Sequence, residues 1–222
     1  MKILFLIFLA FFLNCAPLAW AEGEVTIVAL GDSTTAGTPG FRSPVEAPPD
    51  GEGNPQSQYA YWIMRRHPDW KVLNRGVNGE RSDQILKRFS SDVVPFKPRI
   101  VVVLAGVNDL YRGYPPRHVE EQLKRIYDSA AKEQIRVVAC TILPYNGMSP
   151  SVRSRIQEVN GWIRSYSGKH HLGFCDTFHL LENPKRPWNL ISSPDRLHPD
   201  VAGYRKMGEA IAGSIEKLLA AR

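Results

Sequence analysis

The sequence of 222 residues lacks the features that define several classes of protein. Its three cysteines are too few for a disulfide framework. No block of Lys and Arg interleaved with aromatic residues occurs, and the excess of 28 basic over 22 acidic residues is scattered along the chain. A phosphate-binding Gly-x-x-x-x-Gly-Lys-Ser/Thr loop is also missing. We therefore expect no nucleic-acid partner and no cofactor.

Metal-ligand patterns are equally sparse. His170 and His171 are adjacent but have no acidic or cysteine ligand set near them in sequence, so they read as surface residues. His67, His118 and His179 are isolated. The sequence predicts no metal site.

Long hydrophobic runs are confined to the N-terminus. Lys2 precedes an apolar run from Ile3 to Leu13 of about 11 residues, well short of the roughly 20 that span a bilayer. The stretch Ala19–Ala21 then supplies small residues before Glu22, as in a secretory signal peptide. We expect a signal peptide over residues 1–21, cleavage after it, and one domain over 22–222 with no stable membrane span.

A lipoprotein is the less favoured alternative for this N-terminus. Cys15 could carry a lipid, but the three residues before it, Phe-Leu-Asn, make a poor lipobox. Either route leads to a secreted or periplasmic protein. In such a compartment Cys140 and Cys175 could pair. Each lies in or beside an apolar run, however, which slightly favours buried free thiols.

Apolar stretches of strand length alternate with amphipathic stretches of helix length, the pattern of a parallel sheet covered on both faces. The expected strands are Val25–Leu30, Lys71–Asn74, Ile100–Ala105, Arg136–Ile142 and Leu172–Asp176. The expected helices are 59–66, 83–89, 116–133, 151–167 and 200–219. The fold class is therefore α/β.

Between the first strand and its helix lies a long segment, Thr38–Gln58, rich in Pro, Gly and charge. It exceeds the usual length of a strand-to-helix loop. Two interpretations stay open with equal weight. The segment is either a tolerated surface insertion or a wall or lid over a site at the end of the first strand. Trp188 similarly fits a pocket wall and plain packing equally well.

Four short stretches carry side chains with catalytic potential. In a parallel α/β sheet, ligands bind beyond the carboxyl ends of the strands, and three of these stretches follow successive strands. The fourth leads into the last helix and can return to the same edge. The stretches are Gly31-Asp32-Ser33, Asn74 to Gly79, Gly106-Val107-Asn108-Asp109 and Asp195-Arg196-Leu197-His198-Pro199.

These residue types match the needs of acyl transfer. A serine such as Ser33 becomes nucleophilic when a base such as His198 accepts its proton. Asp195, three residues before the histidine, could orient the imidazole. Backbone N–H groups of Ser33 and Gly79 and the side-chain amide of Asn108 could stabilise an oxyanion. Singly, each stretch also fits a turn or a helix cap; their order along the chain favours the catalytic interpretation.

The ordered set resembles the GDSL family of serine hydrolases, also called the SGNH superfamily. The four stretches span residues 31 to 199, most of the chain. The resemblance implies Ser33 as nucleophile, Asp195 and His198 as its catalytic partners, and Ser33, Gly79 and Asn108 as the oxyanion hole. It also implies a flavodoxin-like three-layer αβα sandwich with a five-stranded parallel sheet in the order 2-1-3-4-5, and ester or thioester hydrolysis without a metal.

Two features depart from the family pattern. Thr34 stands where the family name has Leu, at a position expected to pack and not to react. The segment Thr38–Gln58 puts any borrowed substrate in doubt. The leading expectation is an exported serine esterase acting on a small or glycan-linked ester. The alternatives are a catalytically silent glycan-binding module or, among enzymes, a polysaccharide O-acetylesterase or a lysophospholipase.

Overall fold

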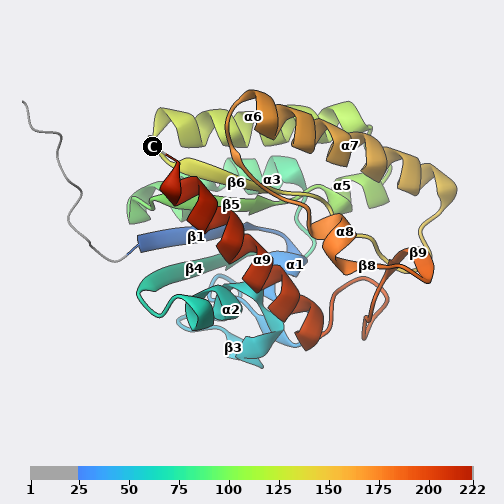
Figure 1. Ribbon diagram of the computed structural model, residues 1–222, viewed down its shortest axis with the longest axis horizontal. Coiled ribbons are helices and arrows are strands. Elements are labelled where there is room, and N and C mark those ends of the chain that lie inside the picture. The colour runs from blue at the N-terminus through green and yellow to red at the C-terminus, as the bar shows by residue number, and fades with distance from the viewer. Residues whose placement is uncertain (1–24, 222) are drawn as a thin grey trace, which may run out of the picture.

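The computed structural model describes residues 25–221, so the signal peptide expected over 1–21 lies outside the described residues. Its centre is a parallel sheet of five strands in the order β4-β1-β5-β6-β7 (Figure 1). The strands are β1 (Val25–Gly31), β4 (Trp70–Gly76), β5 (Ile100–Leu104), β6 (Arg136–Cys140) and β7 (Gly173–Cys175). Numbered along the chain within this sheet, the order is the 2-1-3-4-5 that the resemblance implies. The predicted fold class is confirmed.

Helices cover both faces of the sheet and complete three layers (Figure 1). Helices α2 (Tyr59–Arg66) and α9 (Val201–Ala220) pack on one face. The opposite face is covered by α3 (Ser82–Lys87), α6 (Pro116–Lys132) and α7 (Pro150–Lys169). All five were expected within a few residues, because an apolar stripe at helical spacing marks the face that each helix buries.

Each strand contributes side chains to the hydrophobic cores on both faces of the sheet, because successive side chains point to opposite faces. On β5, Val101 and Val103 belong to the core beneath α3, α6 and α7, whereas Ile100 and Val102 belong to the core beneath α2 and α9. Every residue of β5 is buried, as its unbroken apolar run predicts for a central parallel strand.

Cys140 and Cys175 lie opposite each other on β6 and β7. Both are buried, and the thiols are free. The favoured interpretation from the sequence is thereby confirmed. Of residues 25–221, no stretch of helix combines the length and the apolar character that crossing a membrane requires.

The segment 38–58 is folded, and none of its residues lines the pocket next to His198. It contains the short strands β2 (Phe41–Arg42) and β3 (Glu52–Gly53) and a 3-10 turn, Pro55–Ser57. Glu46 accepts hydrogen bonds from the backbone N–H and side-chain amide of Asn78, at 2.9 and 2.7 Å. The Ser43 hydroxyl donates to the Gly76 carbonyl at 2.6 Å. The segment therefore supports, from the side, the loop that follows β4.

Several short elements were not anticipated from the sequence. They include a small hairpin near the end of β7, which lies on the right of Figure 1. Their lengths are too short for a periodic pattern to emerge. They are α1 (Ser33–Ala36), α4 (Phe89–Asp92), the 3-10 turn Val94–Phe96, α5 (Val107–Tyr111), α8 (Thr177–Leu181), β8 (Glu182–Asn183) and β9 (Arg186–Leu190).

Candidate active site

Ser33 is presented by an abrupt change from strand to helix. β1 ends at Gly31 and α1 begins at Ser33, with the Asp32 carboxylate accepting the Thr34 N–H at 3.0 Å as the helix cap. A Cβ at position 31 would lie 2.3 Å from the Leu104 carbonyl oxygen, so only glycine fits between the strands here. Thr34 is buried, as expected of a packing position.

The structure brings Ser33, His198 and Asp195 into one hydrogen-bonded row. His198 Nε2 lies 2.8 Å from Ser33 Oγ, across 165 residues of sequence. His198 Nδ1 lies 2.6 Å from Asp195 Oδ2. Because an ionised carboxylate only accepts hydrogen bonds, Nδ1 carries the proton and donates to Asp195. In the neutral ring Nε2 is then free to accept the Ser33 hydroxyl proton.

The Asp195 carboxylate is fixed by its own turn. Its Oδ1 accepts the backbone N–H groups of Leu197 and His198, at 3.0 and 2.8 Å. Arg196 takes a positive φ of 74° so that the chain can turn back. Partial burial raises the pKa of Asp195, but the hydrogen bonds from His198 and the turn outweigh it and hold the pKa below its usual value. Asp195 therefore stays ionised.

Gly79 lies in the loop after β4, close to the serine turn. The Val77 N–H donates to the Gly31 carbonyl at 3.1 Å, which ties this loop to the end of β1. Gly79 has a positive φ of 72°, and Arg112 donates to its carbonyl at 3.0 Å. Within residues 25–221, the N–H groups of Gly79 and Ser33 donate to no protein acceptor. Both donors are available to a ligand.

Asn108 lies in the first turn of α5. Its side-chain Nδ2 donates to the Glu80 carbonyl at 2.9 Å, so the amide is held against the Gly79 loop. An amide has two N–H donors, and this bond uses one of them. The other is free to serve a ligand at the same edge.

Arg88 is a positioning group that the sequence analysis missed. Its guanidinium donates to the Gly31 carbonyl at 2.8 Å, to Glu80 at 2.6 Å and to Asp92 at 2.7 Å. The three side chains are largely buried, at 14, 18 and 16% exposure. Arg88 thus joins the serine turn to the loop that carries Gly79. An arginine on a short amphipathic stretch resembles a solvated surface residue, so the sequence offers no signal for it.

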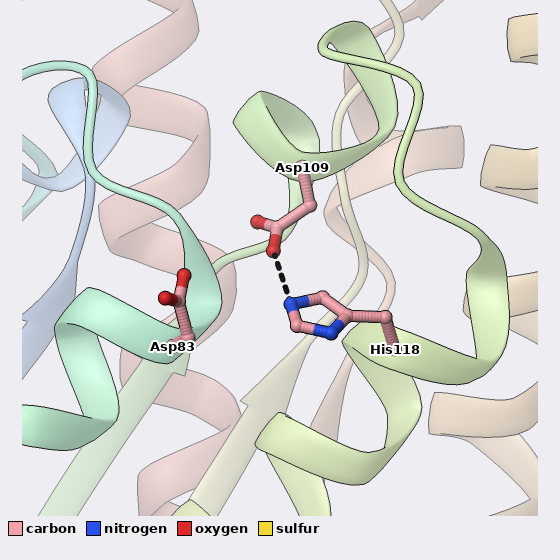
Figure 2. A group of neighbouring side chains, drawn as sticks. All are labelled: Asp83, Asp109 and His118. Atoms are coloured by element: carbon pink, nitrogen blue, oxygen red, sulfur yellow. Dashed lines mark ion pairs between the residues drawn. The ribbon is translucent and has the colours of Figure 1, made fainter.

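Behind Asn108 lies a cluster of Asp83, Asp109 and His118, which point toward one another (Figure 2). Buried Asp109 accepts the hydroxyl and the backbone N–H of Ser82, at 2.7 and 2.9 Å, and so pins α3 to α5. His118 Nε2 lies 3.6 Å from Asp109, too far for a hydrogen bond.

Two carboxylates and an imidazole can bind a cation when they lie close together, and the candidate ligand atoms of this cluster lie within 4.8 Å of one another. However, Asp83 is already paired with Arg81 at 2.9 Å. Ser82 donates one hydrogen bond to each oxygen of Asp109. The cluster is therefore organised by protein contacts, and we assign it a supporting role beneath Asn108.

Asp32 is buried directly beside Ser33 in the chain. Loss of solvation raises the pKa of Asp32 to about 7, although the Thr34 N–H and the Arg88 charge act in the opposite direction. The carboxyl group therefore titrates near neutral pH within the serine turn.

A small cavity of about 10 Å³ adjoins His198. Its walls are mainly apolar and include Val107, Ile142, Leu143 and Tyr145. A space of this size is close to the minimum that holds one water molecule. It has room for a group about the size of a methyl.

Comparison with known proteins agrees with this geometry. The model of the GDSL-like lipase/acylhydrolase family matches residues 29–206. The chain belongs to the GDSL-like lipase/acylhydrolase family. Membership places it among ester-bond hydrolases. The chain is also similar in structure to a member of the lipolytic G-D-S-L family from Veillonella parvula. The match has a TM-score of 0.71 and 17% identity, and it covers 85% of this chain and 96% of that one. That likeness supports the fold.

Three curated relatives illustrate the range of this GDSL-like family. A Bacillus subtilis lipoprotein is 25% identical over 80% of this chain, which spans 65% of the relative's length. An acetylxylan esterase of Geobacillus stearothermophilus is 23% identical over 65% of this chain and 72% of its own. An arylesterase of Vibrio mimicus is 22% identical over 90% of this chain and 93% of its own.

Proposed function

We propose that the protein is an exported serine esterase that acts through an acyl-enzyme intermediate. The observation that carries the proposal is the row Ser33–His198–Asp195, with contacts of 2.8 and 2.6 Å. His198 takes the Ser33 proton as Ser33 Oγ attacks the ester carbonyl. It then gives that proton to the leaving alcohol. Water attacks the acyl-serine in the same way and releases the acid. Asp195 holds the ring and stabilises its positive charge throughout.

The oxyanion that forms in each step needs donors that are already in place. We assign this role to the N–H groups of Ser33 and Gly79 and to the free N–H of the Asn108 amide. The bond from Asn108 to the Glu80 carbonyl limits rotation of that amide. Such preset donors stabilise the transition state, and the loss of one typically costs about 3–4 kcal/mol.

The acyl group that fits best is a short one. A space of about 10 Å³ beside His198 has room for the methyl of an acetyl ester. The fatty chain of a lysophospholipid is larger than this space and would have to lie outside it. The name of one relative, an acetylxylan esterase, agrees with a short acyl group, whereas an Escherichia coli relative that is 30% identical over 48% of this chain is named a thioesterase and lysophospholipase, so the choice depends on the size of the space. Among the enzyme alternatives we therefore favour an acetylesterase over a lysophospholipase.

The proposal that the protein is exported is supported by the sequence before β1 and by the name of one relative. The apolar run and the small residues at Ala19–Ala21 have the pattern of a cleaved signal peptide. The relative from Bacillus subtilis is named a lipoprotein. Measuring the mass of the mature chain tests this directly: cleavage after residue 21 removes the first 21 residues, whereas lipidation would retain Cys15 and add the mass of the lipid.

Labelling by a fluorophosphonate tests the enzyme proposal, because that reaction requires an activated serine. We expect the native chain to be labelled at Ser33 and to hydrolyse 4-nitrophenyl acetate. The variant Ser33→Ala should keep its fold and lose both properties. The alternative, a silent glycan-binding module, predicts no labelling and no turnover in the native chain. An unlabelled native chain would therefore overturn the esterase proposal.

A further inference from the structure

A second, larger cavity opens at the carboxyl ends of β6 and β7, between α7 and the hairpin β8–β9. Its volume is about 300 Å³, at the lower end of the roughly 300–1,000 Å³ that is typical of ligand sites. None of its lining residues belongs to the Ser33–His198–Asp195 row. The lining residues that matter here are Gln157, Gly161, Arg164, Asp176, Glu182 and Trp188.

Gly161 keeps one side of this cavity open. It lies inside α7, where glycine destabilises a helix by roughly 0.5–1 kcal/mol relative to alanine. Packing does not require it, because a Cβ built at this position meets nothing within 4 Å. A larger side chain would instead project into the cavity. The glycine therefore leaves this part of the cavity wall without a side chain.

Trp188 forms an aromatic wall on the opposite side. Its φ is +68°, a conformation that costs of order 1–3 kcal/mol for a bulky residue and that recurs at ligand-binding positions. The Glu182 carboxylate holds it there by accepting its backbone N–H at 2.8 Å. The indole also packs edge-to-face on Phe178, with ring centroids 5.5 Å apart. The aromatic surface is therefore fixed in place before any ligand arrives.

The charges around the cavity mostly compensate one another. Asp176 is paired with Arg164 and with His179, whose Nδ1 lies 2.9 Å from the carboxylate. Gln157 is exposed and Trp188 half-buried, so the Gln157 amide and the Trp188 indole are both accessible from the cavity. An aromatic surface beside neutral donors and acceptors suits a neutral ring that bears hydroxyl groups. Apolar C–H faces of a sugar can stack on the indole while its hydroxyls bond the amide and Glu182.

This cavity lies next to the small one beside His198. Thr141 lines the large cavity, and the next residue, Ile142, lines the small one. The Asn160 side chain also lines the large cavity, and it bonds both the N–H and the carbonyl of Ile142, at 2.8 and 2.9 Å. The strand end that separates the two spaces is therefore held rigidly. A polymer bound in the large cavity would have to cross this strand end for its ester group to reach Ser33.

We propose that the large cavity binds a neutral sugar unit in the alcohol part of the substrate, so that the natural substrate is an ester on a glycan. This inference rests on the proposed esterase function and names the substrate class of the same enzyme.

Binding to the native full-length mature chain tests the site without any reaction. The probes are ester-free cello-, xylo-, manno- and chito-oligosaccharides, titrated by isothermal calorimetry. We expect one of these series to bind and the variant Gly161→Leu to weaken its binding by about tenfold or more. Gly168→Leu is the matched control: Gly168 lies on the same helix, and its Cβ would likewise meet nothing within 4 Å. It should bind as the native chain does.

Two results would overturn the sugar site. Either no series binds the native chain, or Gly161→Leu binds as well as Gly168→Leu. Catalysis gives the second readout. Gly161→Leu should raise KM for the acetylated form of the sugar that binds and leave hydrolysis of 4-nitrophenyl acetate unchanged. If the native chain is not labelled by the fluorophosphonate, the esterase proposal itself is wrong. If it is labelled but binds no sugar, only the sugar site is wrong.

Discussion

At the carboxyl edge of the sheet, the region around β1, β4 and β5 differs from the region around β6 and β7. At the ends of β1, β4 and β5, glycines allow close approach, Arg88 and Asn108 bond backbone carbonyls, and the space left is about 10 Å³. At the ends of β6 and β7, a helix glycine and a strained tryptophan border a space of about 300 Å³. The first region holds Ser33 and His198 in a fixed geometry, and the second leaves space for a larger group. Chemistry that depends on sub-ångström geometry needs the former, whereas recognition of a larger group needs the latter.

The strongest contrast should come from removing one side chain at each end. His198→Ala should lower kcat/KM for 4-nitrophenyl acetate by about 10⁴-fold or more, because the serine loses its base. Trp188→Ala at the other end should leave this small substrate within about twofold, since the ester does not reach the cavity. Steady-state kinetics on both folded variants decide the matter. A large loss in Trp188→Ala would show that the two regions do not act separately.

Replacing one arginine at each end should show the same contrast in the free energy of unfolding. Arg88→Met leaves Glu80 and Asp92 without their partner in a largely buried setting, and we expect the free energy of unfolding to fall by about 3–5 kcal/mol. Arg164→Met is the control at the other end. The Arg164 side chain is 56% exposed, so its loss should cost no more than about 1 kcal/mol. Urea denaturation measures both, and equal losses would contradict the comparison.

Asp32 and Asp176 should respond to pH with opposite sign. Burial raises the pKa of Asp32 from 3.8 to about 7, so the folded state binds this proton more tightly than the unfolded state. The stability that this proton contributes is therefore lost as the pH rises from about 4 to about 7. Asp32→Asn cannot ionise, so at pH 8 it should be more stable than the native chain by up to about 4 kcal/mol, with little difference near pH 4.

For Asp176 the balance is reversed. Burial raises its pKa, but the hydrogen bonds from His179 and the charge of Arg164 outweigh it, and the pKa lies below its usual value. The ionised form is thus favoured by folding, and its contribution is lost as the pH falls through that lowered pKa. Asp176→Asn should accordingly be less stable than the native chain at pH 8. Urea midpoints at pH 4 and pH 8 measure both variants; the same sign for both at pH 8 would contradict these assignments.

The smallest expected effect concerns the size of the space beside His198. Val107 is half-buried in its wall, and Val107→Ala should enlarge it at little cost in stability. The ratio of kcat/KM for 4-nitrophenyl butyrate to that for the acetate should then rise by about tenfold, the scale that one added methylene carries in an apolar pocket. Gly161→Leu should leave this ratio unchanged. An unaltered ratio in Val107→Ala would place the acyl group elsewhere.

Much of the architecture follows from local patterns. The unbroken apolar run Ile100–Leu104 indicates a strand buried on both faces, and apolar stripes of helical period indicate the long helices 116–132 and 201–220. Short elements were missed because four or five residues carry no period. The role of segment 38–58 was undecided for a similar reason: its contact with Asn78 pairs residues about 30 positions apart, which no local pattern reveals.

The sequence by itself determined the fold class, the family and the order of Ser33, Gly79, Asn108, Asp195 and His198 along the chain, because residue type and spacing are local properties. Only the tertiary structure decided which of these atoms meet. It also brought Arg88 to the serine turn and gathered the walls of the large cavity from α7, the hairpin and the ends of β6 and β7. Contacts across more than a hundred residues depend on how the layers pack, and burial, not sequence, gives a group such as Asp32 its altered proton affinity.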